Sequence, residues 1–159
     1  MIAKTKTLTR NLLIDAALLT AACLIPAASH LLALPLYMFN PMLALLLAAI
    51  LLGRDWRNAL MMAILLPAVS CLLTGMPTAA KMLCMMAELV TIAAIFTWLQ
   101  HKWHTLPAIL TAIIAGKAVF YIMKAIVIAP AMLVTTPWTI QLLAVLLWGG
   151  LFTLLYKKN

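Results

Sequence analysis

The chain has 159 residues, of which 67% are hydrophobic and only 9% are charged. Soluble domains contain about 45–50% apolar residues, so this composition excludes an ordinary soluble enzyme and predicts an all-α membrane protein with one domain over residues 1–159. The formal net charge is +8. Most of the basic residues stand at the ends of apolar runs, where they orient membrane helices, so we do not expect nucleic acid as a partner.

The first apolar run, residues 12–28, is predicted to be a retained membrane helix that follows a basic N-terminus. Pro26 lies near the outer end of this run and is expected to kink or end the helix, because proline lacks a backbone N–H. Residues 30–40 are too polar and too rich in proline for a plain helix. We therefore expect an irregular segment at the outer membrane face.

Five more spans are predicted, which gives six transmembrane helices in all. Gly53 is expected to end the second span, because glycine is the usual residue just past a helix C-terminus. A turn is predicted at residues 74–77, and Pro107 is expected at the start of the fifth helix. The spans after the first are 39–52, 58–73, 79–99, 107–129 and 138–156. The pattern leaves the start of the second span open.

Lysine and arginine gather on one side of this arrangement. They occupy the N-terminus, the loops after the second and fourth spans, and the C-terminus, whereas the three opposite loops contain none. Lys81 lies just inside the start of the fourth span. Cytoplasmic loops of membrane proteins carry an excess of lysine and arginine, so both termini are predicted to lie in the cytoplasm.

The sequence contains none of the common motifs for catalysis or for nucleotide binding. The P-loop, zinc-protease and nucleophile-elbow patterns are all missing. His101 and His104 stand in a hydrophilic loop without a third ligand, so we interpret them as solvated loop residues. Asp15 is next to Arg10 and Asn11 and is interpreted as a local ion pair or an interfacial group. We predict no catalytic residue, no metal site and no cofactor, and hence no enzyme.

Four ionisable residues lie within the fourth and fifth spans, where each would cost roughly 2.5–3.5 kcal/mol at the membrane centre. Lys81 and Glu88 share one helical face of the fourth span. Lys117, Tyr121 and Lys124 share one face of the fifth. At about 1.5 Å per residue, Glu88 and Lys117 lie roughly 13 and 16 Å below the outer ends of their helices, so we expect them to pair.

Two interpretations of these residues are open. In the first, Lys81 and Lys124 extend to the outer interface, and Glu88 and Lys117 form a structural pair. In the second, the residues line a pocket that opens to the outside, and its excess of positive charge fits a small anionic ligand. The candidate ligand-binding residues are then Lys81, Glu88, Lys117, Tyr121, Lys124, Trp138, Gln141 and Asn40.

Residues 40–100 carry short motifs of a known family. They are Asn40-Pro41 before a span that ends Leu51-Leu52-Gly53, the run Leu72-Leu73-Thr74-Gly75-Met76-Pro77 after Pro67, and Met86-Ala87-Glu88-Leu89. With these motifs and six short-looped spans, the chain resembles the S components of energy-coupling factor (ECF) vitamin transporters. In that family an A-x-x-x-A face of the first helix, similar to Ala17 and Ala21 here, docks on the transmembrane coupling subunit.

The resemblance implies a multi-pass substrate-binding subunit in the bacterial cytoplasmic (inner) membrane. Its substrate would be a vitamin or cofactor precursor taken from outside, and its partners a transmembrane coupling subunit and two cytoplasmic ATPase subunits. The chain does not match the biotin, thiamine or riboflavin subtypes. Two other functions stay open: a non-transporting membrane assembly or interaction subunit, and a stand-alone proton-coupled transporter with Glu88 as the proton site.

Overall fold

The computed structural model describes residues 2–33, 36–53, 55–127 and 137–156, without the side chains of residues 2–8, 37 and 138. The described residues form helices and connecting turns, with no strand among them. The elements are α1 (Ile2–Leu31), the short 3-10 helix η1 (Leu36–Phe39), α2 (Pro41–Gly53), α3 (Trp56–Thr74), α4 (Ala79–Leu99), α5 (Thr105–Val127) and α6 (Trp138–Leu155). The predicted all-helical fold is therefore confirmed.

Four helices, α1, α3, α4 and α5, are long and apolar enough to cross a membrane. The described part of α6 and the whole of α2 are apolar but shorter. At about 1.5 Å per residue, α2 is about 20 Å long, whereas the hydrocarbon core of a bilayer is about 30 Å thick. These lengths indicate a membrane protein in which α2 by itself reaches only part of the way across.

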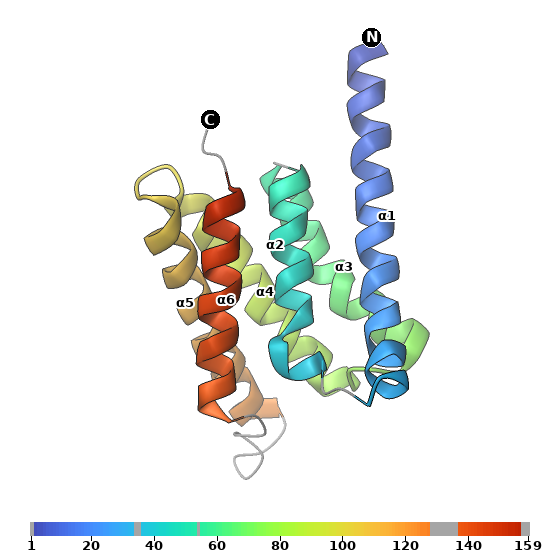
Figure 1. Cartoon of the computed structure of the whole chain (residues 1–159), viewed down its shortest axis with the longest axis vertical. Coiled ribbons are helices and arrows are strands. Elements are labelled where there is room, and N and C mark those ends of the chain that lie inside the picture. The colour runs from blue at the N-terminus through green and yellow to red at the C-terminus, as the bar shows by residue number, and fades with distance from the viewer. Residues whose placement is uncertain (1, 34–35, 54, 128–136, 157–159) are drawn as a thin grey trace.

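Helix α1 stands at one edge of the bundle, beside α2 and α3, and its first turns project beyond the ends of the other helices (Figure 1). Helices α4 and α5 make the most extensive contact, and α6 packs on α5 and α2. The start of α1, the end of α6 and the α2–α3 and α4–α5 connections all lie at one end of the bundle (Figure 1). We call it the terminal end; it carries the segments that the charge pattern predicts to be cytoplasmic.

Small residues allow the helices of the core to approach closely. Ala63, Ala93 and Ala112 are completely buried in α3, α4 and α5. At Gly116 in α5, an added Cβ would overlap the side chain of Ile92 and lie 3.0 Å from the backbone oxygen of Glu88. Close approach of this kind is typical of small residues between membrane helices. The close approach of α4 and α5 at Gly116 brings the next residue, Lys117, beside α4.

The predicted boundaries of the middle helices agree with the structure. Helix α4 has the predicted bounds, and α2 ends at Gly53. The turn after α3 is confirmed, because Gly75 has a φ of 70° and its N–H bonds back to the carbonyl of Cys71. Pro107 lies in the first turn of α5 as expected. The last residues of the predicted fifth span, 128–129, lie outside the described residues.

Of the two predicted effects of Pro26, a kink or the end of the helix, the second is wrong, because α1 continues to Leu31. A proline removes the N–H that would bond the carbonyl four residues earlier, which is that of Ala22. The hydroxyl of Ser70 in α3 lies 3.3 Å from the Ala22 oxygen and 2.8 Å from the Met76 oxygen. A neighbouring helix therefore supplies a donor where Pro26 removes one, and α1 continues past the proline.

Replacing Ser70 by alanine is expected to lower the free energy of unfolding by about 1–3 kcal/mol, because the buried carbonyl oxygen of Ala22 loses its donor. In a Pro26→Ala background the loss should be smaller, since the new N–H of residue 26 can bond the Ala22 oxygen directly. Unfolding of the four proteins in detergent, followed by circular dichroism, measures both losses. Equal losses in the two backgrounds would show that the Ala22 carbonyl does not need Ser70.

Polar contacts at the terminal end differ from one of the two interpretations of Asp15, the local ion pair. Its carboxylate accepts a hydrogen bond of 3.0 Å from Asn58 Nδ2 in α3, so its described partner is not the neighbouring Arg10. Asp55 accepts a bond of 3.0 Å from the N–H of Arg57 and thereby caps the start of α3. Both carboxylates at this end are therefore used to position helices.

Candidate functional site

The centre of the candidate site is an ion pair between α4 and α5. Lys117 Nζ lies 2.7 Å from Glu88 Oε1, and the side chain of Glu88 is only 3% exposed while that of Lys117 is 22% exposed. The predicted pairing of these two residues is confirmed. The close helix contact at Gly116 explains the short distance, because Lys117 follows it directly and Glu88 contributes the opposing backbone.

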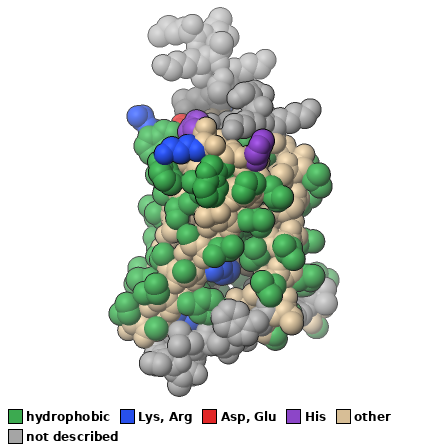
Figure 2. Space-filling model, turned by 90° about the vertical axis from the view of Figure 1, so that its left-hand side faces the viewer, with side chains coloured by type: hydrophobic (Ala, Val, Ile, Leu, Met, Phe, Trp, Pro, Cys, Tyr) green, Lys and Arg blue, Asp and Glu red, His purple; other side chains and the backbone are tan. Residues whose placement is uncertain are grey.

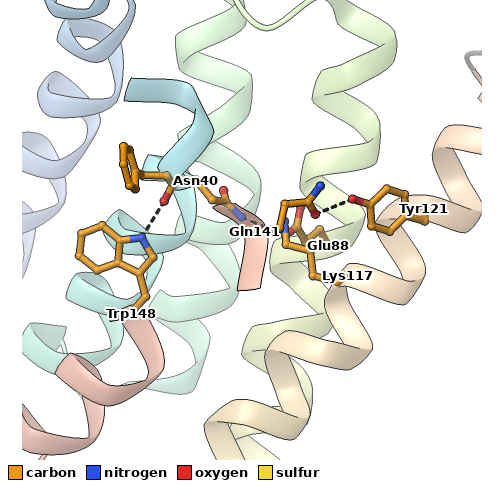
Figure 3. Close-up of polar contacts among 7 residues, drawn as sticks. Asn40, Glu88, Lys117, Tyr121, Gln141 and Trp148 are labelled. Atoms are coloured by element: carbon orange, nitrogen blue, oxygen red, sulfur yellow. Dashed lines mark hydrogen bonds and ion pairs between the residues drawn. The ribbon is translucent and has the colours of Figure 1, made fainter. Parts of the chain in front are cut away.

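Asn40 is the third member of this cluster. Its Nδ2 donates to Glu88 Oε1 over 3.2 Å, and its φ of 50° lies in the left-handed region that asparagine adopts more readily than most residues. The Asn40 carbonyl accepts from the N–H groups of Leu43 and Ala44. One residue thus ends η1, begins α2 and contacts Glu88; we call Asn40, Glu88 and Lys117 the central cluster (Figure 3).

The central cluster lies about midway along the bundle. At about 1.5 Å per residue, Asn40, Glu88 and Lys117 are about 20, 17 and 18 Å from the ends of their helices at the terminal end. Helix α2 therefore begins at the depth of the ion pair. Irregular backbone at membrane depth is tolerated where protein buries it or where it lines a cavity. The positive end of the α2 dipole also favours a carboxylate at this place.

A second polar contact joins α5 to α6. The hydroxyl of Tyr121 donates to Gln141 Oε1 (Figure 3), and the ring of Tyr121 packs edge-on against Phe120 at 5.6 Å. Tyr121 is one turn farther along α5 than Lys117, away from the terminal end. The structure thus brings two further predicted ligand-binding residues together next to the central cluster.

The two outer lysines differ in their surroundings. Lys124 in α5 is buried, with 6% of its surface exposed. Lys81, at the start of α4, is exposed. The exposure of Lys81 agrees with the interpretation that its side chain extends to the outer interface. The burial of Lys124 does not agree with that interpretation. The predicted contribution of Trp138 stays untested, because its side chain lies outside the described residues.

Trp148 is a site residue that the sequence analysis missed. Its Nε1 donates to the carbonyl of Phe39 over 2.7 Å, which fixes η1 to α6 beside Asn40 (Figure 3). Tryptophan in membrane proteins is enriched at the two interfaces. Trp148 lies in the interior of the last predicted span, and this unusual position is the signal that would have indicated a polar contact away from the interfaces.

A small cavity of about 30 Å³ lies at the terminal end, lined by Asp55, Phe96, Gln100 and Tyr156 among others. Ligand pockets measure about 300–1,000 Å³, so this cavity has room for water only. It does not adjoin the central cluster. The predicted fifth and sixth spans are joined by residues 130–137, of which 130–136 lie outside the described residues.

Two other predicted features can be placed in the structure. On α1, Ala17 is exposed and Ala21 is half-buried in the single chain. His101 and His104 are both exposed in the α4–α5 turn. Among the residues that the structure describes, no group of three or more His, Cys, Asp and Glu side chains could hold a metal ion.

No protein-family model, no curated protein and no solved structure matches the chain.

Proposed function

We propose that this chain is the substrate-binding subunit of a membrane importer, similar to the S components of ECF transporters. The observation that carries the proposal is the central cluster, a buried ion pair that meets the start of a short helix at mid-depth. Ionisable groups inside membrane bundles normally face a substrate path or a wet cavity. Transporters commonly build their binding sites where a membrane helix is interrupted at this depth.

In this proposal six helices cross the cytoplasmic membrane of a bacterium, and both termini lie in the cytoplasm. The segment that holds η1 extends α2 to the outer face. Figure 2 supports the orientation, since His, Lys and Arg side chains lie at the terminal end, although Lys or Arg side chains are also visible lower on the mainly hydrophobic flank. Basic residues at one end are what the positive-inside rule associates with the cytoplasm.

The ligand is a small, water-soluble vitamin or cofactor precursor with a carboxylate or a phosphate. Glu88 already balances the charge of Lys117, so Lys81 and Lys124 leave two net positive charges in the outer half of the bundle. An anionic ligand is the natural complement of this excess of positive charge. Tyr121 and Gln141 supply hydrogen-bonding groups at the same place, and Trp138 supplies an aromatic surface.

Replacing Lys124 or Lys81 by methionine is expected to weaken ligand binding about ten- to a hundred-fold. A charge-assisted hydrogen bond contributes roughly 1.5–3 kcal/mol, which corresponds to this range of affinity. The ligand comes from a thermal-shift screen of anionic vitamins and precursors on the detergent-solubilised protein. Lys102→Met at the terminal end is the matched control and should bind normally. If neither outer variant changes the affinity, the lysines only extend to the interface.

Transport in this proposal requires a coupling subunit and two ATPase subunits, with α1 as the docking helix. Ala17→Trp is expected to abolish uptake in cells that hold the whole complex, because a large side chain prevents close approach of two helices. Ligand binding to the purified subunit should stay intact. Leu154→Trp on α6, where Leu154 is 83% exposed, is the control. Full uptake by the chain alone in liposomes would contradict the need for partners.

A second function is favoured by one observation: the polar side chains of the central cluster contact one another. Glu88 Oε1 already contacts both Lys117 and Asn40, so the cluster stabilises the bundle without any ligand. This arrangement also suits a non-transporting assembly subunit, in which buried charges fix the packing of helices. The ligand screen distinguishes the two functions. A substrate-binding subunit should be stabilised by one of the anionic vitamins or precursors, whereas an assembly subunit should not be stabilised by any of them.

A further inference from the structure

The α4–α5 turn gathers exposed aromatic and basic side chains at the terminal end. Trp98, in the last turn of α4, is 61% exposed, and Trp103 is 46% exposed. His101, Lys102 and His104 are exposed between and beside them. Figure 2 shows Lys, Arg and His side chains at this end of the bundle. None of these residues belongs to the proposed ligand site.

Hydrogen bonds hold this turn in one shape. The N–H groups of Lys102 and Trp103 both donate to the carbonyl of Leu99 over 2.9 Å. The hydroxyl of Tyr156, at the end of α6, donates to Gln100 Oε1 over 2.6 Å. The basic and aromatic side chains are therefore presented on an ordered backbone, which reduces the entropy lost when a ligand binds.

Lys102 lies directly against the neighbouring tryptophan. Its Nζ is 4.3 Å from the centroid of the Trp98 ring, which is the geometry of a cation–π contact. A similar pair stands at the start of α3, where the Arg57 guanidinium lies 5.5 Å from the Trp56 ring. Tryptophan rings in membrane proteins sit at the level of the lipid head groups. Each pair therefore holds a cation at that level.

No carboxylate of the described residues neutralises these cations. The sequence has three acidic residues; Glu88 pairs with Lys117 at mid-depth, Asp15 bonds Asn58, and Asp55 caps α3. Among the described side chains, the ion pair of Lys117 and Glu88 is the only one. The charge of Lys102 is thus complementary to an anion from outside the chain.

We infer that Trp98 and Lys102 bind the head group of an anionic phospholipid. The Lys102 ammonium contacts the lipid phosphate, and the exposed Trp98 ring lies against the glycerol and the first carbons of the acyl chains. A lipid fits better than a soluble anion because the surface beside the Lys102 ammonium is the apolar ring of Trp98, which is 61% exposed.

The test titrates the detergent-solubilised full chain with phosphatidylglycerol and, separately, with phosphatidylcholine, and measures the first bound lipid by native mass spectrometry. A basic residue near a membrane surface adds affinity for anionic lipid worth about fivefold. We expect the wild-type chain to prefer phosphatidylglycerol by at least about this factor. Lys102→Gln and Trp98→Leu should each lose most of the preference, whereas Lys102→Arg should keep it.

His30→Gln is the control, since it changes an exposed basic side chain at the end of the bundle opposite the α4–α5 turn and should keep the preference for phosphatidylglycerol. Equal affinity of the wild-type chain for the two lipids would overturn the inference. A preference that survives in both Lys102→Gln and Trp98→Leu would overturn the location. Displacement of phosphatidylglycerol by excess inorganic phosphate would show a site for free phosphate in place of a lipid. All of these outcomes are independent of whether the chain imports a vitamin.

Discussion

Replacing Glu88 by alanine is expected to lower the free energy of unfolding by about 3–5 kcal/mol, the usual cost of removing one partner from a buried ion pair. The substitution leaves the Lys117 ammonium without the oxygen that lies 2.7 Å from it. It also removes the acceptor for the Asn40 side chain at the start of α2. Chemical unfolding in detergent, followed by circular dichroism, measures the loss.

A double-mutant cycle separates the ion pair from the general effect of each substitution. The double variant Glu88→Gln with Lys117→Met contains no unpaired charge, so its loss should be clearly smaller than the sum of the two single losses. The cycle keeps side chains of similar size at both positions. Additive losses would mean that Glu88 and Lys117 do not stabilise each other.

Gly116→Ala is expected to destabilise the bundle by about 1–3 kcal/mol, the usual cost of overpacking a core. The new Cβ would overlap the side chain of Ile92 and lie 3.0 Å from the Glu88 carbonyl oxygen, so α4 and α5 must move apart. Elsewhere in a helix the same change stabilises by roughly 0.5–1 kcal/mol. Unfolding in detergent measures the change in stability.

The matched control for this prediction is Gly150→Ala in α6, where an added Cβ would meet nothing within 4 Å. This variant should be as stable as the wild-type chain or slightly more stable. Removing the obstructing side chain with Ile92→Ala should reduce the cost of Gly116→Ala. If Gly116→Ala and Gly150→Ala have the same stability, the close helix contact does not position the ion pair.

Features that depend on one helix at a time could be predicted from the sequence. Helix α4 has the predicted bounds because Pro77 precedes it and a hydrophilic run beginning at Gln100 follows it. The pairing of Glu88 with Lys117 also followed from counting residues along two neighbouring helices, since a fixed rise per residue puts both at one depth. Local composition and helix geometry were sufficient in both cases.

Contacts that depend on how distant helices pack could not be predicted in this way. Asn40 reaches Glu88 across 48 positions of the sequence, and Trp148 reaches the carbonyl of Phe39 across 109. The continuation of α1 past Pro26 has the same origin, because the donor that serves the carbonyl of Ala22 belongs to α3. No periodicity within one segment reports such pairings.

Mass spectrometry of the small molecules released from the purified, denatured chain tests most directly whether the outer half of the bundle holds a ligand. From wild-type protein purified out of bacterial membranes, we expect a carboxylate- or phosphate-bearing compound in nearly stoichiometric amount. Lys124→Met should release much less of it, and Lys102→Met as much as the wild type. A wild-type chain that releases no such compound, and whose unfolding midpoint no anionic vitamin or precursor raises, would contradict the proposed function.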